Sequence, residues 1–104
     1  MRWYNRLYMG KKAKRHQRSI IRHIREQKFI PDAYVITSAS NGNNILDIYP
    51  AFVLLHPEYA GEDFLVLGIA SGYWEALEVV RQIVDDLYQQ TGELDLNSLI
   101  EQKR

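Results

Sequence analysis

The chain has 104 residues, of which 46% are hydrophobic and 25% charged, values typical of one soluble globular domain spanning residues 1–104. It contains no cysteine, which excludes disulfide bonds, thiolate metal sites and a cysteine nucleophile. No apolar run approaches the roughly 20 residues of a membrane-spanning helix. The first residues also lack the apolar core of a secretory signal, so we expect a cytoplasmic protein without membrane contacts.

The formal net charge of zero hides a division along the chain. Residues 1–30 hold ten Lys and Arg against Glu26 as the one acidic residue, which gives +9, so the remaining residues carry −9. Three arrangements explain such a division: a nucleic-acid-binding arm, pairing of a basic with an acidic element inside the molecule, or head-to-tail pairing of two copies. The charge distribution alone does not choose among them.

Apolar side chains near the N-terminus follow a helical spacing. Trp3, Tyr4, Leu7 and Tyr8 stand at positions i, i+1, i+4 and i+5, which predicts a short helical turn before Gly10. Such a turn would present an apolar patch. The patch would cover a sheet face of its own chain or leave that face to a second copy.

Residues 11–28 have the pattern of an amphipathic basic helix. Apolar residues recur at helical spacing from Ala13 to Ile24, and Pro31 ends the helix. The charged face carries six candidate phosphate-binding residues: Lys11, Lys14, Arg15, Arg18, Arg22 and Arg25. With the N-terminal aromatic residues nearby for stacking, this face favours nucleic-acid binding. The rival interpretation is a face that is only solvated, or paired with acidic neighbours.

A β-hairpin is predicted next. Residues 33–37 are rich in β-branched and aromatic side chains, and Asn41-Gly42 suits the positive φ angles of a tight turn within residues 40–44. The partner strand would run over residues 45–55, interrupted at Pro50, which cannot donate a ladder hydrogen bond. The polar, turn-rich residues that follow, 56–63, are predicted to form a loop.

Residues 64–70 form the third predicted strand. This strand carries apolar side chains on both sides. Leu65, Leu67 and Ile69 lie on one side, and the apolar residues of the other side include Val66. Neither face of this strand can therefore be left in water.

A second amphipathic helix is predicted to begin after Gly72 as N-cap and to end at Thr91-Gly92. Its apolar stripe faces a largely acidic side, and Glu75 in the first turn favours the helix start. The junction at residues 68–72 lacks the lysine of a phosphate-binding loop, so we predict that it serves in packing and capping. Residues 95–100 are predicted to add a short final helix.

Together these elements predict an α+β domain of order α-β-β-β-α, with a three-stranded, mainly antiparallel sheet and two main helices side by side on one face. The basic helix would then lie beside the acidic one. The opposite sheet face would need a cover, so our first functional prediction is a non-enzymatic protein-interaction domain that forms a homodimer. The predicted interface comprises Trp3, Tyr8, Leu65, Leu67 and Ile69. Nucleic-acid binding through the basic helix is the alternative.

No residue pattern indicates catalysis or a metal. His16 and His23 are seven residues apart and form no His-x-x-x-His pair, so we predict no metal site and no cofactor. His56, Glu58 and Asp63 would act as acid–base groups only if their loop brings them together. A small enzyme or ligand-binding domain using that loop is therefore the second alternative.

Three segments together resemble a small bacterial protein family of unassigned activity. They are Trp3-Tyr4-x-x-Leu7-Tyr8-x-Gly10, Ser40-Asn41-Gly42-Asn43-Asn44-x-Leu46-Asp47-Ile48 and Gly68-x-Ala70-x-Gly72-Tyr73-x-Glu75-Ala76-Leu77. The resemblance covers about residues 3–92 and implies a bacterial cytoplasmic setting. It implies no catalytic or binding residue.

Overall fold

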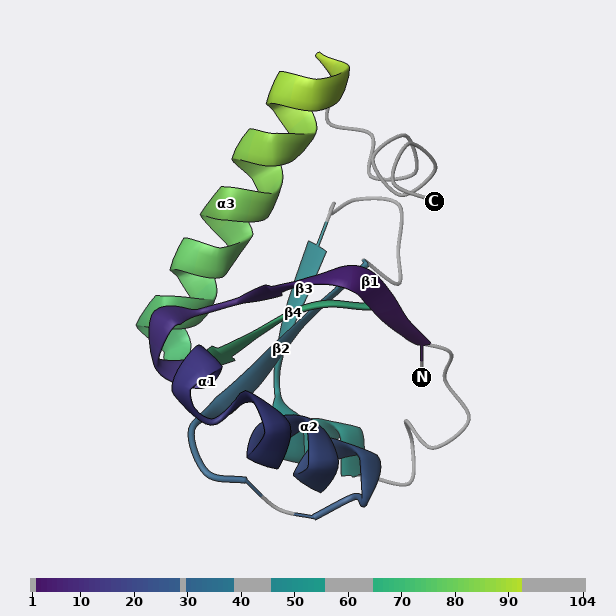
Figure 1. Cartoon of the computed structure of the whole chain (residues 1–104), viewed down its shortest axis with the longest axis vertical. Coiled ribbons are helices and arrows are strands. Elements are labelled where there is room, and N and C mark those ends of the chain that lie inside the picture. The colour runs from purple at the N-terminus through teal and green to yellow at the C-terminus, as the bar shows by residue number, and fades with distance from the viewer. Residues whose placement is uncertain (1, 29, 39–45, 56–64, 93–104) are drawn as a thin grey trace.

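A computed structural model of the chain describes residues 2–28, 30–38, 46–55 and 65–92. These residues form a mixed sheet with helices on both faces (Figure 1). In chain order the elements are β1 (Arg2–Met9), α1 (Lys11–Arg15), α2 (Gln17–Arg25), β2 (Ala33–Ser38), β3 (Leu46–Pro50), the 3₁₀ helix η1 (Ala51–Leu55), β4 (Leu65–Ser71) and α3 (Tyr73–Thr91). The fold belongs to the predicted α+β class.

The sheet has four strands in the order β1-β4-β2-β3. Strand β2 is antiparallel to both β3 and β4, whereas β1 is parallel to β4. The prediction of a three-stranded sheet is therefore wrong, because residues 2–9 add a parallel edge strand. The predicted helical turn before Gly10 is wrong for the same reason.

The N-terminal segment is a strand because its apolar side chains serve both faces of the sheet. Trp3 and Leu7 pack against the core cluster on one face, and Tyr4 and Tyr8 belong to the cluster on the other. Extended backbone points neighbouring side chains in opposite directions, which a helical turn does not. The pairing with β4 is interrupted by a register shift between Trp3 and Tyr8.

The antiparallel pairing of the predicted hairpin strands is confirmed, with Ile36 opposite Ile48. The second strand is shorter than predicted. It stops at Pro50, and residues 51–55 turn into η1, where Ala51 and Leu54 are buried. The predicted turn at 40–44, the loop at 56–63 and the final helix at 95–100 lie outside the described residues.

Strand β4 is the centre of the core. It pairs with β1 along one edge and β2 along the other. Val66, Leu67, Ile69 and Ala70 are fully buried, so the prediction that both of its sides need cover is confirmed.

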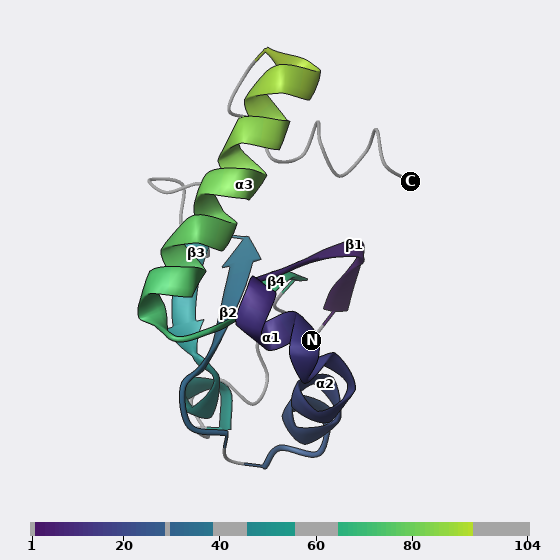
Figure 2. The same ribbon diagram turned by 60° about the vertical axis from the view of Figure 1, so that its left-hand side comes forward.

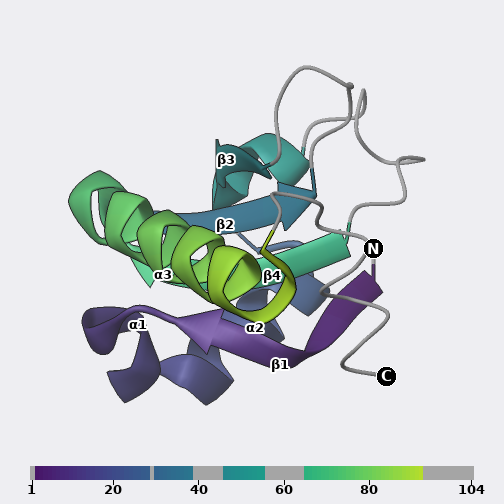
Figure 3. The same ribbon diagram turned by 90° about the horizontal axis from the view of Figure 1, so that it is seen from above.

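The helices lie on opposite faces of the sheet (Figure 2), so the prediction of both main helices on one face is wrong. Helix α3 packs Val79 and Ile83 against Leu67 and the rest of one core cluster, and it lies along the sheet between β1 and β3 (Figure 3). Helices α1 and α2 pack their apolar residues, Ile24 among them, against Val66 and the second cluster. A strand that is apolar on both sides requires two covering layers, and this chain supplies both.

The predicted basic helix is broken in two. The backbone at His16 leaves helical geometry, with φ −124° and ψ 28°, and separates α1 from α2. Helix α2 ends at Arg25, and Gln27 beyond it has a positive φ of 58°. Because of the break, the buried Ala13 lies on α1 and the buried Ile20 and Ile24 lie on α2. Each short helix can therefore pack its own apolar side against the sheet.

Candidate nucleic-acid interface

The outer side of α1 and α2 is a basic surface. We define it by the six residues that the sequence singled out, Lys11, Lys14, Arg15, Arg18, Arg22 and Arg25, all of which are exposed. The inner side of the same helices is apolar, with Ala13, Ile20 and Ile24 buried in the core. Burial of one side of each helix thus forces the cations outward, as the amphipathic pattern predicts.

Most of these cations are not held in an ion pair within the described part of the chain. Among the described residues, Lys11, Lys14, Arg15, Arg18 and Arg22 form no ion pair. Glu26, the acidic residue of this segment, pairs with Lys28 at 3.2 Å between Nζ and Oε2. The basic surface therefore keeps its charge.

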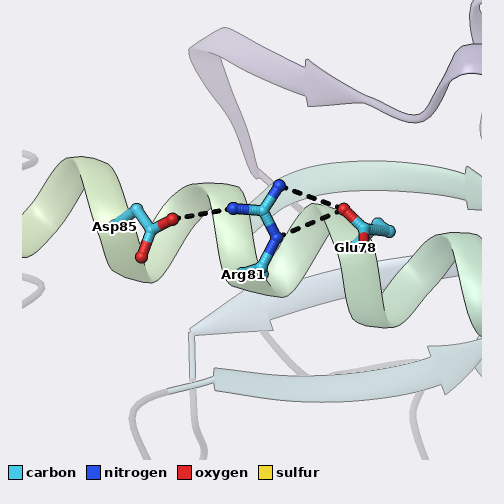
Figure 4. A network of polar contacts seen from close by, with 3 residues as sticks. All are labelled: Glu78, Arg81 and Asp85. Atoms are coloured by element: carbon cyan, nitrogen blue, oxygen red, sulfur yellow. Dashed lines mark hydrogen bonds and ion pairs between the residues drawn. The ribbon is translucent and has the colours of Figure 1, made fainter.

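The acidic side chains of α3 are engaged elsewhere. Arg81 binds Glu78 and Asp85 of its own helix, with nitrogen–oxygen distances of 3.1 and 2.8 Å (Figure 4). Helix α3 lies across the sheet from α2, and its carboxylates come near the basic surface only at the start of α1, where Glu75 and Glu78 line a hollow with Lys11. The predicted placement of the basic helix beside the acidic one is thus wrong.

One acidic residue of α3 does contact the basic segment, through its backbone. The Glu75 carboxylate accepts hydrogen bonds from the backbone N–H of Lys12 at 2.9 Å, of Ala13 at 3.1 Å and of Ser71 at 2.9 Å. Burial alone would raise the pKa of Glu75, but these three donors outweigh it and lower the pKa below its ordinary value. Glu75 therefore caps the start of α1 and ties it to Ser71 at the end of β4, which fixes α1 in place.

Gly10 makes this cap possible. A Cβ atom at Gly10 would overlap the Glu75 carboxylate. The backbone N–H of Gly10 also donates to the carbonyl oxygen of Ile69 at 2.9 Å, which extends the pairing of β1 with β4 up to the start of α1. The sequence analysis recognised Glu75 as a helix-start residue but missed its second partner, which is 62 or more positions away.

Three hollows follow the basic surface. The first, at the junction of α1 and α2, is lined by Lys14, Arg15, His16, Gln17, Arg18 and Ser19. The second, along α2, is lined by Gln17, Arg18, Ile21, Arg22, Arg25 and Glu26. The third, which we call the Trp3 pocket, has about 240 Å³ and is lined by Trp3, Ile24, Arg25, Gln27, Lys28, Ala51 and Leu54. Consecutive hollows share residues, so together they form one continuous track.

The Trp3 pocket lies where β1, α2 and η1 meet. The Arg25 guanidinium stands over the Trp3 ring, 5.5 Å from its centre, as in a cation–π contact. Ala51 and Leu54 contribute apolar surface, and Gln27 and Lys28 contribute polar groups. This is the site where an aromatic ring, an apolar wall and cations come together.

The residues predicted as a dimer interface do not form one surface. Leu65, Leu67 and Tyr8 pack under α3, whereas Trp3 and Ile69 belong to the opposite face. Leu67 and Ile69 are fully buried and Leu65 is 9% exposed, so the sheet face expected to await a partner is covered by the chain itself. Tyr8 is half-buried, and its hydroxyl donates to Asp86 at 2.7 Å.

A β-bulge explains why Ile69 changes sides. The register between β2 and β4 shifts between Ile36 and Thr37, which face Gly68 and Val66, so Leu67 is the extra residue. One extra residue reverses the alternation beyond it. A Cβ at Gly68 would approach Val79 of α3 to 2.8 Å, so glycine allows the helix to pack closely at the bulge.

The remaining predicted chemistry is sparse. His23 contacts its own helix, with Nδ1 2.6 Å from the carbonyl oxygen of Ser19. The described residues contain no cluster of His, Asp and Glu suited to a metal ion. His56, Glu58 and Asp63 lie outside the described part of the chain.

No protein-family model, curated protein or solved structure matches this chain. The resemblance to a bacterial family, with the cytoplasmic setting that it implies, therefore stays a prediction. None of the helices in the described segments is long and apolar enough to cross a membrane.

Proposed function

We propose that this domain binds nucleic acid through its basic surface. The observation that carries the proposal is a row of five exposed cations, Lys11, Lys14, Arg15, Arg18 and Arg22, without an ion-pair partner among the described residues. Contact with phosphates releases the counterions condensed on a nucleic acid, and this release drives binding. Of the two rival interpretations, pairing with acidic neighbours would instead engage these cations in ion pairs, and a merely solvated face would show no salt-dependent binding of nucleic acid.

The size and placement of the surface support this function. Helix α2 has nine residues and is therefore about 14 Å long, comparable to about four steps of a nucleic-acid strand. Helix α3, which carries the acidic residues Asp85 and Asp86, lies across the sheet from α2, whereas Glu75 and Glu78 of its first turns lie beside Lys11 at the start of α1. A polyanion would attract the basic side and repel the other, which orients the encounter.

Fluorescence anisotropy with labelled 12-nucleotide DNA and RNA, single- and double-stranded, at low salt tests the proposal. The matched pair of variants is R18A and R81A, each of which removes one exposed arginine and lowers the net charge by one. We expect R18A to weaken binding several-fold and the triple variant R15A/R18A/R22A to abolish it, because these cations would face phosphates. R81A should bind like the wild type.

Two results would overturn the proposal. One is that no DNA or RNA probe shows salt-dependent binding. The proposal fails in this way also if the protein binds phosphatidylserine vesicles but no nucleic acid. The other is equal weakening by R18A and R81A, which would indicate a non-specific effect of net charge.

Self-association is a second candidate function, on a surface other than the one predicted from sequence. Helix α3 exposes Trp74 to 81%, Tyr88 to 61% and Tyr73 to 50%, and the Tyr73 ring contacts both Tyr34 and Trp74 edge to face. Large exposed aromatic side chains are enriched at protein–protein contacts. Light scattering at rising concentration tests this function: W74K should shift a dimer to monomer, and a wild-type monomer at high concentration would exclude it.

A further inference from the structure

The Trp3 pocket differs from the hollows at the helix junction and along α2, because it adds an aromatic ring to the cations. The hollow beside Lys11 also contains an aromatic ring, Trp74, but it is lined by the carboxylates of Glu75 and Glu78, which the Trp3 pocket lacks. A phosphate needs only charge and hydrogen-bond donors. The half-buried Trp3 ring, Ala51 and Leu54 match instead a flat, largely apolar ligand group. The Arg25 guanidinium over Trp3 adds a planar, charged surface of the kind on which nucleobases stack.

The pocket is also continuous with the cation track. Arg25 lines both the Trp3 pocket and the neighbouring hollow along α2, and Arg18 joins that hollow to the one at the helix junction. A strand whose phosphates follow Arg18 and Arg22 would thus reach Trp3 at the end of α2. Because the hollows are adjacent, one ligand can place its phosphates along α2 and one of its bases in the Trp3 pocket at the same time.

We infer that the nucleic acid bound here is single-stranded, and that one unpaired base enters the Trp3 pocket and stacks on the Arg25–Trp3 pair. The inference rests on the proposed function. The bases of a duplex are already stacked and paired, and extruding one of them costs binding energy, whereas a single strand presents its bases freely. DNA and RNA share the chemistry needed, phosphates on one side and an exposed base on the other.

The intrinsic fluorescence of Trp3 gives a direct test. The sequence has two tryptophans, so W74F leaves Trp3 as the sole tryptophan, and Trp74 does not line the Trp3 pocket. We expect 12-nucleotide thymidine DNA and uridine RNA to quench Trp3. A 12-base-pair duplex and a 12-nucleotide strand with abasic sites throughout should not quench it, although their phosphates are intact.

Arginine-to-lysine variants separate stacking from charge. R25K keeps the charge but loses the planar guanidinium, so we expect it to weaken single-strand binding about tenfold, the effect of losing one stacking contact, and to leave duplex binding unchanged. R22K is the matched control on the same helix and should alter neither by more than about twofold. Both positions are exposed, so the variants should fold.

The outcomes distinguish the two proposals. If single strands and duplexes bind equally, Trp3 is not quenched and R25K behaves like R22K, while R15A/R18A/R22A still abolishes binding, then the pocket inference fails and the proposed function stands. If no nucleic acid binds, both fail. Quenching by either DNA or RNA single strands, together with the R25K effect, supports the inference.

Discussion

The side chain of Glu75, in the first turn of α3, accepts a hydrogen bond from the backbone N–H of Lys12, in the first turn of α1, at 2.9 Å. One carboxylate in the first turn of α3 thereby caps α1, which lies on the opposite face of the sheet, and also accepts from Ser71 at the end of β4. The free N–H groups at a helix start favour a negative charge, so both helices are stabilised by the same group. The stability of the basic surface should therefore depend on a residue that is not part of it.

Replacing this carboxylate should destabilise the fold. We expect E75Q to lower the free energy of unfolding by about 1–2 kcal/mol, because a neutral amide offers one acceptor oxygen and no charge to the three backbone donors. Urea unfolding followed by circular dichroism measures the difference. E78Q is the control, since Glu78 is exposed and its ion pair among the described residues is with Arg81; an equal loss in both variants would contradict the role of Glu75.

The same cap predicts a pH dependence of stability. Burial opposes it, but the three backbone donors hold the pKa of folded Glu75 below its ordinary value of 4.5. A depressed folded-state pKa gives stability that is present above 4.5 and lost as the pH falls through the lowered value. The stability difference between wild type and E75Q should thus be constant near neutral pH and shrink below it. A difference that persists in strong acid would argue against the cap.

Gly10 and Glu75 should be energetically coupled. G10A forces a methyl group into the space of the Glu75 carboxylate, so we expect it to cost about 1–3 kcal/mol. In an E75A background the space is free, and the same change should cost less than about 0.5 kcal/mol. A double-mutant cycle by urea unfolding measures the coupling, and additive effects would show that Gly10 is needed for another reason.

The hydrogen bond from Tyr8 to Asp86 ties β1 to α3. Burial, and then this bond, raise the pKa of Tyr8 above that of an ordinary tyrosine. We expect Y8F to lower the free energy of unfolding by about 1 kcal/mol and to remove from an ultraviolet titration one tyrosine that ionises above the ordinary pH. Y88F, at an exposed position, should instead leave stability unchanged. A loss of stability in Y88F and none in Y8F would refute the contribution of the Tyr8–Asp86 hydrogen bond.

Nucleic-acid binding should show a defined response to salt. If Lys11, Lys14, Arg15, Arg18 and Arg22 each contact one phosphate, the logarithm of the single-strand binding constant should fall with the logarithm of the salt concentration at a slope of about −3.5. R18A should reduce the slope to about −2.8. Anisotropy titrations at four or five salt concentrations give both values, and a slope near zero would show that phosphates are not the ligand.

Sequence patterns predicted the elements whose periodicity allows one interpretation. Residues 73–91 form the expected helix, because their apolar stripe returns every three or four positions. Residues 33–38 form the expected strand, and the six outward cations of residues 11–25 are exposed as predicted. In these segments the local pattern and the final packing agree.

The patterns failed where two structures fit one spacing. Apolar residues at i, i+1, i+4 and i+5 suit a helical turn, but they equally suit a strand buried on both faces, which is what Trp3, Tyr4, Leu7 and Tyr8 form. The bulge at Leu67 reverses the side of Ile69, and its local signal, Gly68 inside the strand, does not give the position of the extra residue. The basic and acidic helices lie on opposite faces of the sheet because of the way the chain crosses from one face to the other. The sequence pattern of a single segment does not predict such a crossing.

The parallel pairing of β1 with β4 sets an order of assembly. In the described structure β1 pairs with β4, which begins at Leu65. During synthesis on the ribosome, β1 therefore cannot form this pairing until β4 has also been synthesised. Non-local pairing of this kind slows the completion of a fold. The cations of the first thirty residues thus leave the ribosome before β4, the central strand of the sheet on which α1 and α2 pack. A product truncated before β4 would carry these cations without the sheet that fixes their arrangement.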